Sequence, residues 1–84
     1  MVKFLVLGLG FIAMHVAEEL SKLGQVTVTY RSLSGVNSVY AEILRGTVEL
    51  AELNPLTDED KLRSLIKNSD TVINLIGALS NDAQ

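Results

Sequence analysis

The sequence predicts an α/β fold in which a parallel sheet of about four strands, in the order 3-2-1-4, carries helices on its faces. Two observations predict this architecture. Apolar runs typical of buried strands alternate along the chain with segments of helical periodicity, and the connections between these segments are short. Strands that alternate with helices pair in parallel through right-handed crossovers. Residues 1–84 are therefore expected to form one domain, a truncated half of a doubly wound fold.

The first strand is expected at residues 3–7, because a nearly uninterrupted apolar run is typical of a strand covered on both faces. A helix is expected to follow from Phe11. Its apolar residues recur at helical spacing and predict one buried stripe: Ile12, Val16, Leu20 and Leu23. Gly24 is expected to end this helix in a left-handed conformation.

The middle of the chain predicts two further strands. Residues 25–30 are rich in β-branched and aromatic side chains and predict the second strand. After a loop of Ser, Gly and Asn, a short helix is expected at residues 39–44, and residues 47–53 predict the third strand. Pro55 marks the exit from this strand, because proline cannot donate a hydrogen bond to the ladder.

One more helix and one more strand complete the predicted order. Thr57 is expected to cap the helix, and the acidic residues after it favour the positive end of the helix dipole. The buried stripe of this helix is expected to comprise Leu62, Leu65 and Ile66. Residues 71–77 form another apolar run, which predicts the fourth strand.

Composition excludes several kinds of protein. The chain has no cysteine and a single histidine, His15, which excludes a disulfide scaffold, a cysteine-based metal site and a multi-histidine cluster. Its seven basic residues are scattered and its net charge is −3, which argues against a nucleic-acid surface. Lys3 ahead of an apolar stretch leaves a secretion signal as an alternative, but glycines interrupt the stretch, and a membrane span would need about 20 apolar residues. A cytoplasmic protein is expected, with neither a metal site nor a nucleic-acid or membrane partner.

A glycine-rich turn joins the first strand to the first helix. Gly8, Gly10 and Ala13 stand at the spacing G-x-G-x-x-A, which is typical of turns that bind a dinucleotide between a strand and a helix. Gly8 would permit the tight turn, Gly10 would let the backbone approach the pyrophosphate, and Ala13 would keep the helix close to the sheet. Phe11 and Ile12 would lie at the helix N-terminus, where free N–H groups favour an anion. The alternative is a turn that uses glycine only for its geometry.

The residues after the second strand favour NADP(H) over NAD(H), although NAD remains possible. An NAD-preferring site places Asp or Glu about twenty residues beyond the glycines, where it bonds the ribose 2′-OH. Here the chain reads Tyr30-Arg31-Ser32 and has no carboxylate at this point. Arg31, with Ser32 or Ser34, is expected to hold a 2′-phosphate through charge-assisted hydrogen bonds. The alternative is that Arg31 is a solvated loop residue.

Three stretches of the chain resemble the extended and atypical short-chain dehydrogenase/reductases, the group that contains nucleotide-sugar epimerases and dehydratases. Residues 10–15 match G-F-I-G-x-H, residues 56–62 match L-T-D-x-x-x-L, and residues 70–77 are similar to D-x-V-I-x-L-A-G. The first glycine of the group's usual G-x-x-G-x-x-G turn would fall at Leu7, so the turn here is one residue shorter. The resemblance implies the NAD(P)-binding portion of a Rossmann-like fold.

The resemblance also implies site residues beyond the glycine turn. Cofactor contacts are expected where the fourth strand ends, at Leu75, Ile76 and Gly77. The group often has an acid that reads the adenine amino group shortly after the third strand. This chain has Pro55 at that position, and Asn54 is the expected substitute.

No catalytic residue is expected within the chain. The group's chemistry uses a Tyr-x-x-x-Lys pair, in which the lysine lowers the pKa of the tyrosine for proton transfer. Here Tyr30 is followed four residues later by Ser34, and Tyr40 is followed by Leu44. His15 is expected to pack beneath the sheet and to take no part in catalysis.

The expected function is the cofactor-binding portion of a longer oxidoreductase or epimerase, which favours NADP(H) and catalyses nothing by itself. Two alternatives remain: a non-catalytic module that binds NADPH structurally or as a sensor, and a stand-alone interaction domain without a cofactor. The fourth strand is expected to present an unpaired edge, through which the chain forms homo-oligomers or aggregates. The apolar residues of this edge are Val72, Ile73, Leu75 and Ile76.

Overall fold

The structure, a computed structural model, describes residues 2–76 and contains one parallel sheet in the order β3-β2-β1-β4. The predicted fold class and strand order are therefore confirmed. The strands are β1 (Lys3–Leu7), β2 (Gln25–Tyr30), β3 (Glu49–Glu52) and β4 (Thr71–Asn74). The helices are α1 (Phe11–Leu20), α2 (Val36–Leu44) and α3 (Glu59–Lys67).

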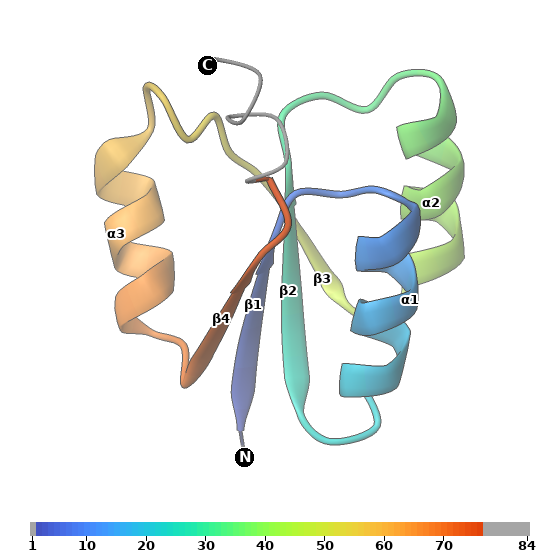
Figure 1. The fold of residues 1–84 in the computed structure, drawn as a ribbon, viewed down its shortest axis with the longest axis horizontal. Helices are drawn as coiled ribbons and strands as arrows, with labels where there is room; N and C mark the ends of the chain where they lie inside the picture. Colours follow the sequence, from blue (N-terminus) through green and yellow to red (C-terminus); the bar gives the residue numbers. More distant parts are fainter. Residues whose placement is uncertain (1, 77–84) are drawn as a thin grey trace.

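The three helices divide unequally between the two faces of the sheet. Figure 1 shows α1 and α2 side by side on one face and α3 alone on the other. Because side chains alternate along a strand, Val6 of β1 packs beneath α1, whereas Leu5 and Leu7 face α3. The core beneath α1 and α2 contains nine buried residues, and the core beneath α3 contains three.

Helix α1 ends at Leu20, three residues earlier than the expected end at Leu23, and the predicted buried stripe is wrong at two positions. Ile12 is 64% exposed and Leu23 is 70% exposed. The face that meets the sheet is built from Ala13, Met14 and Ala17 instead. The small side chains of the two alanines let the helix axis approach the strands closely.

Gly24 is required for a different reason from the one expected. Its φ is not positive, so it is not a left-handed cap. A Cβ atom at this position would collide with the carbonyl oxygen of Val2, which accepts a hydrogen bond of 2.9 Å from the Gln25 N–H. The glycine therefore lets β2 begin directly against the start of β1.

Several predicted boundaries also shift. Helix α2 begins at Val36, earlier than the expected residue 39, while β3 begins at Glu49 and β4 ends at Asn74. Thr57 is not the cap of α3, because the helix begins at Glu59 with Asp58 at the capping position. The expected acidic first turn is present in Glu59 and Asp60.

The predicted buried stripe of α3 is only half-buried. Leu62 and Leu65 are partly covered and pack against the smaller core, while Ile66 is exposed. Helix α3 itself contains no buried residue. The sheet is therefore held mainly by α1 and α2, and α3 covers the other face lightly.

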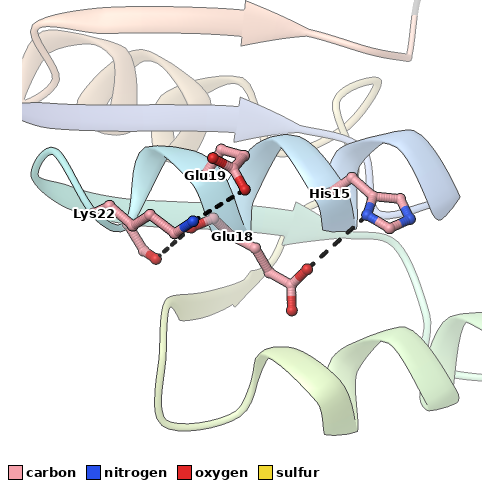
Figure 2. A network of polar contacts seen from close by, with 5 residues as sticks. His15, Glu18, Glu19 and Lys22 are labelled. Atoms are coloured by element: carbon pink, nitrogen blue, oxygen red, sulfur yellow. Dashed lines mark hydrogen bonds and ion pairs between the residues drawn. The ribbon is translucent and has the colours of Figure 1, made fainter.

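His15 lies on the exposed side of α1, so the expectation that it packs beneath the sheet is wrong. Its Nδ1 atom is 4.0 Å from a carboxylate oxygen of Glu18, and Lys22 lies 3.2 Å from Glu19 one turn further on (Figure 2). Exposed ion pairs of this kind contribute about 0–1 kcal/mol to the free energy of unfolding. These ion pairs lie on the outer surface of α1 and are not part of the site described below.

Candidate functional site

A cleft of about 590 Å³ lies where the parallel strands end. In Figure 1 the carboxyl ends of β1, β2 and β4 meet at the edge of the sheet where the β1–α1 connection crosses over. The chain leaves β1 toward α1 on one face, and β4 lies on the other side of β1 from β2. This reversal of strand order is the usual place for a ligand in an open α/β sheet.

The glycine turn forms one wall of the cleft, from Gly8 to Ala13. Gly8 has a φ of +99°, and a Cβ atom there would lie 2.8 Å from Cγ1 of Ile76, so only glycine fits. Gly10 is extended, with a φ of −165°, and a Cβ atom there would meet no other atom within 4 Å. The space beside Gly10 is the open space of the cleft.

The N-terminus of α1 opens onto this wall. Gly10 occupies the capping position, and its carbonyl accepts the first helical hydrogen bond, 2.9 Å from the Met14 N–H. No side chain caps the helix. The first N–H groups of α1 are therefore left for solvent or an anionic ligand, and the helix dipole favours the anion. Ala13 is buried against the sheet as expected.

The end of β2 forms the second wall. Arg31 is exposed and lines the cleft, and among the described residues that do so it carries the only charge. Ser32 is exposed but lies outside the cleft lining. Asn37, half-buried in the first turn of α2, lines the cleft in its place. Sequence reasoning missed Asn37 because it placed the start of this helix at residue 39, beyond the asparagine.

The segment after β3 contributes an apolar wall. Leu53, Pro55 and Leu56 line the cleft, and Leu56 is 83% exposed. Asn54 does not line it, because its side chain closes a local turn in which Oδ1 accepts the Leu56 N–H at 3.0 Å. The Asn54 N–H in turn donates to Oδ2 of Asp58 at 2.9 Å. Sequence reasoning missed this apolar wall.

The end of β4 closes the cleft. Leu75 and Ile76, which the sequence predicts to contact the cofactor, both line it. The Leu75 N–H donates to the carbonyl oxygen of Leu7 at 3.0 Å, and the Ile76 N–H donates to Oδ1 of Asn74 at 2.9 Å. These bonds hold Ile76 against the glycine turn. The third residue predicted here, Gly77, lies outside the described residues.

Thr29 forms the floor between the turn and the end of β2, and sequence reasoning missed it. Its side chain is buried, and its Oγ1 accepts a hydrogen bond of 3.1 Å from the Gly8 N–H. Threonines are common in strands, so a single one carries no signal in the sequence. Only the strand register, which places Thr29 beside Leu7, brings it to the turn.

Two further observations bear on the class of site. Within residues 2–76, no group of three or more His, Cys, Asp or Glu residues is placed to hold a metal ion. In the same part of the chain, no helix has both the length and the apolar character needed to cross a membrane. The cleft thus offers backbone N–H groups, one cation and an apolar wall.

Comparison with known proteins agrees with this chemistry. The model of the saccharopine dehydrogenase NADP binding domain matches residues 4–83, nearly the whole chain. No curated protein matches the chain significantly. The family match confirms the predicted cofactor, NADP, and it does not confirm the short-chain dehydrogenase/reductase type. From its fold, its cleft and this match, the chain belongs to the family of saccharopine dehydrogenase NADP-binding domains.

Proposed function

We propose that the chain holds NADP(H) across this cleft, with the pyrophosphate on the glycine turn and the 2′-phosphate on Arg31, as the cofactor-binding part of an oxidoreductase. One observation carries the proposal. The uncapped N-terminus of α1 and Arg31, which the sequence separates by about twenty residues, line the same cleft. A dinucleotide with a 2′-phosphate needs two anion sites in one cleft.

The pyrophosphate end depends on the backbone of the turn. Gly8, Gly10 and Ala13 support a close approach of phosphate oxygens to the first N–H groups of α1, where Phe11 and Ile12 stand. Fixed N–H groups and the helix dipole favour a double negative charge there. No side chain in the first turn is acidic, so none repels it.

The adenosine end depends on side chains. Arg31 binds the 2′-phosphate, with Ser32 beside it in the chain and Asn37 in the cleft wall. Among residues 2–76, no carboxylate lines the cleft to accept a hydrogen bond from the free 2′-OH of NAD, which supports a preference for NADP. The adenine ring packs on the apolar wall at Leu56, and Asn54 acts on it only indirectly, through the turn that it closes.

The opposite end of the cofactor passes the end of β4. Leu75 and Ile76 form an apolar surface there. This surface supports the nicotinamide end of NADP(H), on which hydride is carried. The described residues that line the cleft support binding and orientation of the cofactor, and we propose that groups outside residues 2–76 carry out proton transfer.

The finer type of the oxidoreductase is a separate proposal. The three stretches shared with extended and atypical short-chain dehydrogenase/reductases support an enzyme of that type, which acts on a sugar nucleotide or a similar alcohol or ketone. A Tyr-x-x-x-Lys pair encoded downstream of these residues would support it. Without such a pair, the cleft supports a non-catalytic NADPH-binding module that is structural or acts as a sensor.

Removing the charge at Arg31 tests the cofactor proposal. We expect calorimetry at low salt to show selective NADP⁺ binding, and Arg31→Ala to weaken it about ten- to a hundredfold, because hydrogen bonds to charged groups contribute about 1.5–3 kcal/mol. Affinity for NAD⁺ should stay unchanged. Arg45→Ala is the matched control, because Arg45 is an exposed arginine at the far end of α2.

Two results would count against the proposal. Equal affinity for NADP⁺ and NAD⁺ would contradict the proposed binding of the 2′-phosphate at Arg31. No affinity for either would favour the remaining alternative, an interaction domain that uses the fold without a cofactor.

We also propose that two copies of the chain associate through β4. Both outer strands of the described sheet leave a backbone edge unpaired, but β3 carries Glu49 and Glu52, whereas β4 carries no charge. Charged residues on an edge strand oppose edge-to-edge pairing. Val72 and Leu75 are partly exposed on the uncharged edge.

Light scattering over a concentration series tests this association. The wild-type chain should form a dimer whose fraction rises with concentration, and Val72→Lys should shift it to the monomer. Val39→Lys places the same charge on an exposed valine of α2 and should leave the dimer intact. A wild-type chain that stays monomeric at high concentration would refute the proposal.

A further inference from the structure

We infer that Thr29 is a positioning residue, whose hydroxyl holds the Gly8 peptide so that the N–H groups after it face the pyrophosphate. The inference rests on the proposed function, because it assigns a role within the same cleft. It adds a residue on β2 to a turn whose sequence signature runs from the end of β1 into the first turn of α1.

The burial of Thr29 is the first observation. Among residues 2–76 it is the one polar residue that is buried, with 1% of its surface exposed. A buried hydroxyl is costly unless it forms hydrogen bonds. Its partner is the N–H of Gly8, 3.1 Å from Oγ1. A valine at this position would suit a buried strand equally well but could not accept a hydrogen bond from the Gly8 N–H.

The second observation is the freedom of Gly8. This residue follows the last register pair between β1 and β2, Leu7 with Thr29, and a side chain accepts its N–H in place of a strand carbonyl. A glycine at a φ of +99° has many alternative conformations, because it lacks a Cβ atom. Ile76 limits the turn from one side, and the Thr29 hydroxyl fixes it from the other.

The third observation is the division of the cleft along β2. Thr29 lies next to the turn, while Arg31, two residues further along, lies at the adenosine end. Because Thr29 occupies the Gly8 N–H, that group is not available to a phosphate, and the anion is left to the first turn of α1. Thr29 therefore affects the affinity for ligands that carry a pyrophosphate, and Arg31 affects the affinity for ligands that carry a 2′-phosphate.

The test combines two variants of the full chain with two ligands. Thr29→Val keeps the side-chain shape and removes the hydroxyl, while Thr29→Ser keeps the hydroxyl and removes the methyl group. NADP⁺ engages both ends of the cleft, and adenosine 2′-monophosphate engages only the Arg31 end. We expect Thr29→Val to weaken the binding of NADP⁺ about tenfold, the equivalent of about 1.4 kcal/mol. The affinity for adenosine 2′-monophosphate should stay unchanged. Thr29→Ser should retain NADP⁺ affinity close to wild type.

Amide hydrogen exchange on the protein without ligand supplies a second readout. The Gly8 amide should exchange slowly in the wild-type chain and in Thr29→Ser, and rapidly in Thr29→Val, while the core amides of β1 stay protected in all three. A rapidly exchanging Gly8 amide in the wild-type chain would overturn the inference even if Thr29→Val failed to fold.

The outcomes separate this inference from the function on which it rests. A wild-type chain that binds neither ligand overturns the proposed function, and the role of Thr29 in binding with it. A wild-type chain that binds both, with Thr29→Val unchanged or equally weakened toward both ligands, overturns the inference alone.

Discussion

Gly10→Ala should remove most of the affinity for NADP⁺ while leaving the fold intact. Gly10 is extended, a conformation open to any residue, and a Cβ atom there meets nothing within 4 Å. That open space is where the pyrophosphate approaches the backbone in the proposed complex. The added methyl group would push the phosphate away from the α1 N–H groups, so we expect a loss of affinity of more than about tenfold.

Calorimetry with NADP⁺ measures this loss, and thermal unfolding without ligand supplies the control. The melting temperature should stay the same or rise slightly, because alanine reduces the conformational freedom of the unfolded chain. Unchanged NADP⁺ affinity in a folded Gly10→Ala protein would show that the ligand does not approach this part of the turn.

Gly24→Ala should have the opposite pattern, with a large loss of stability. A Cβ atom at Gly24 would collide with the carbonyl oxygen of Val2 and come within 3.3 Å of the Phe4 ring. Because the first neighbour is backbone, the start of β1 must move and the hydrogen bond from the Gln25 N–H weakens. Overpacking of this kind costs about 1–3 kcal/mol, which lowers the melting temperature by about 5–20 °C in a domain of this size.

The same substitution at Gly10 serves as the matched control for thermal unfolding. The folded fraction of Gly24→Ala should still bind NADP⁺, because Gly24 lies at the opposite end of β2 from the cleft. A melting temperature equal to that of wild type would mean that Val2 can move aside without cost.

The sequence predicts the fold well because each element has a local signal. Apolar runs mark β1 and β4, and the spacing of Gly8, Gly10 and Ala13 marks the turn. Arg31 was predicted for a related reason, since the distance along the chain from the glycines to the end of β2 is nearly constant in such folds. These signals depend on neighbours in the sequence, not on tertiary contacts.

The features that sequence reasoning missed depend on tertiary contacts. Thr29 matters only because the register sets it beside Leu7, and the apolar wall at Leu56 exists only because the exit of β3 reaches the cleft. The buried face of α1 was misjudged for a similar reason. Hydrophobicity favours Ile12 as a core residue, but the close contact with the sheet selects Ala13 and Ala17.

The light cover that α3 provides has a consequence for motion. Because this helix contains no buried residue and covers only the small core of Leu5, Leu7 and Leu53, we expect its local opening to require less free energy than global unfolding. The cleft wall at Leu53 and Leu56 leads directly into α3, so a bound adenosine favours the attached state of the helix. In the proposed complex, ligand binding would then be coupled to the ordering of α3, and part of the intrinsic affinity would be used to restrict the motion of that helix.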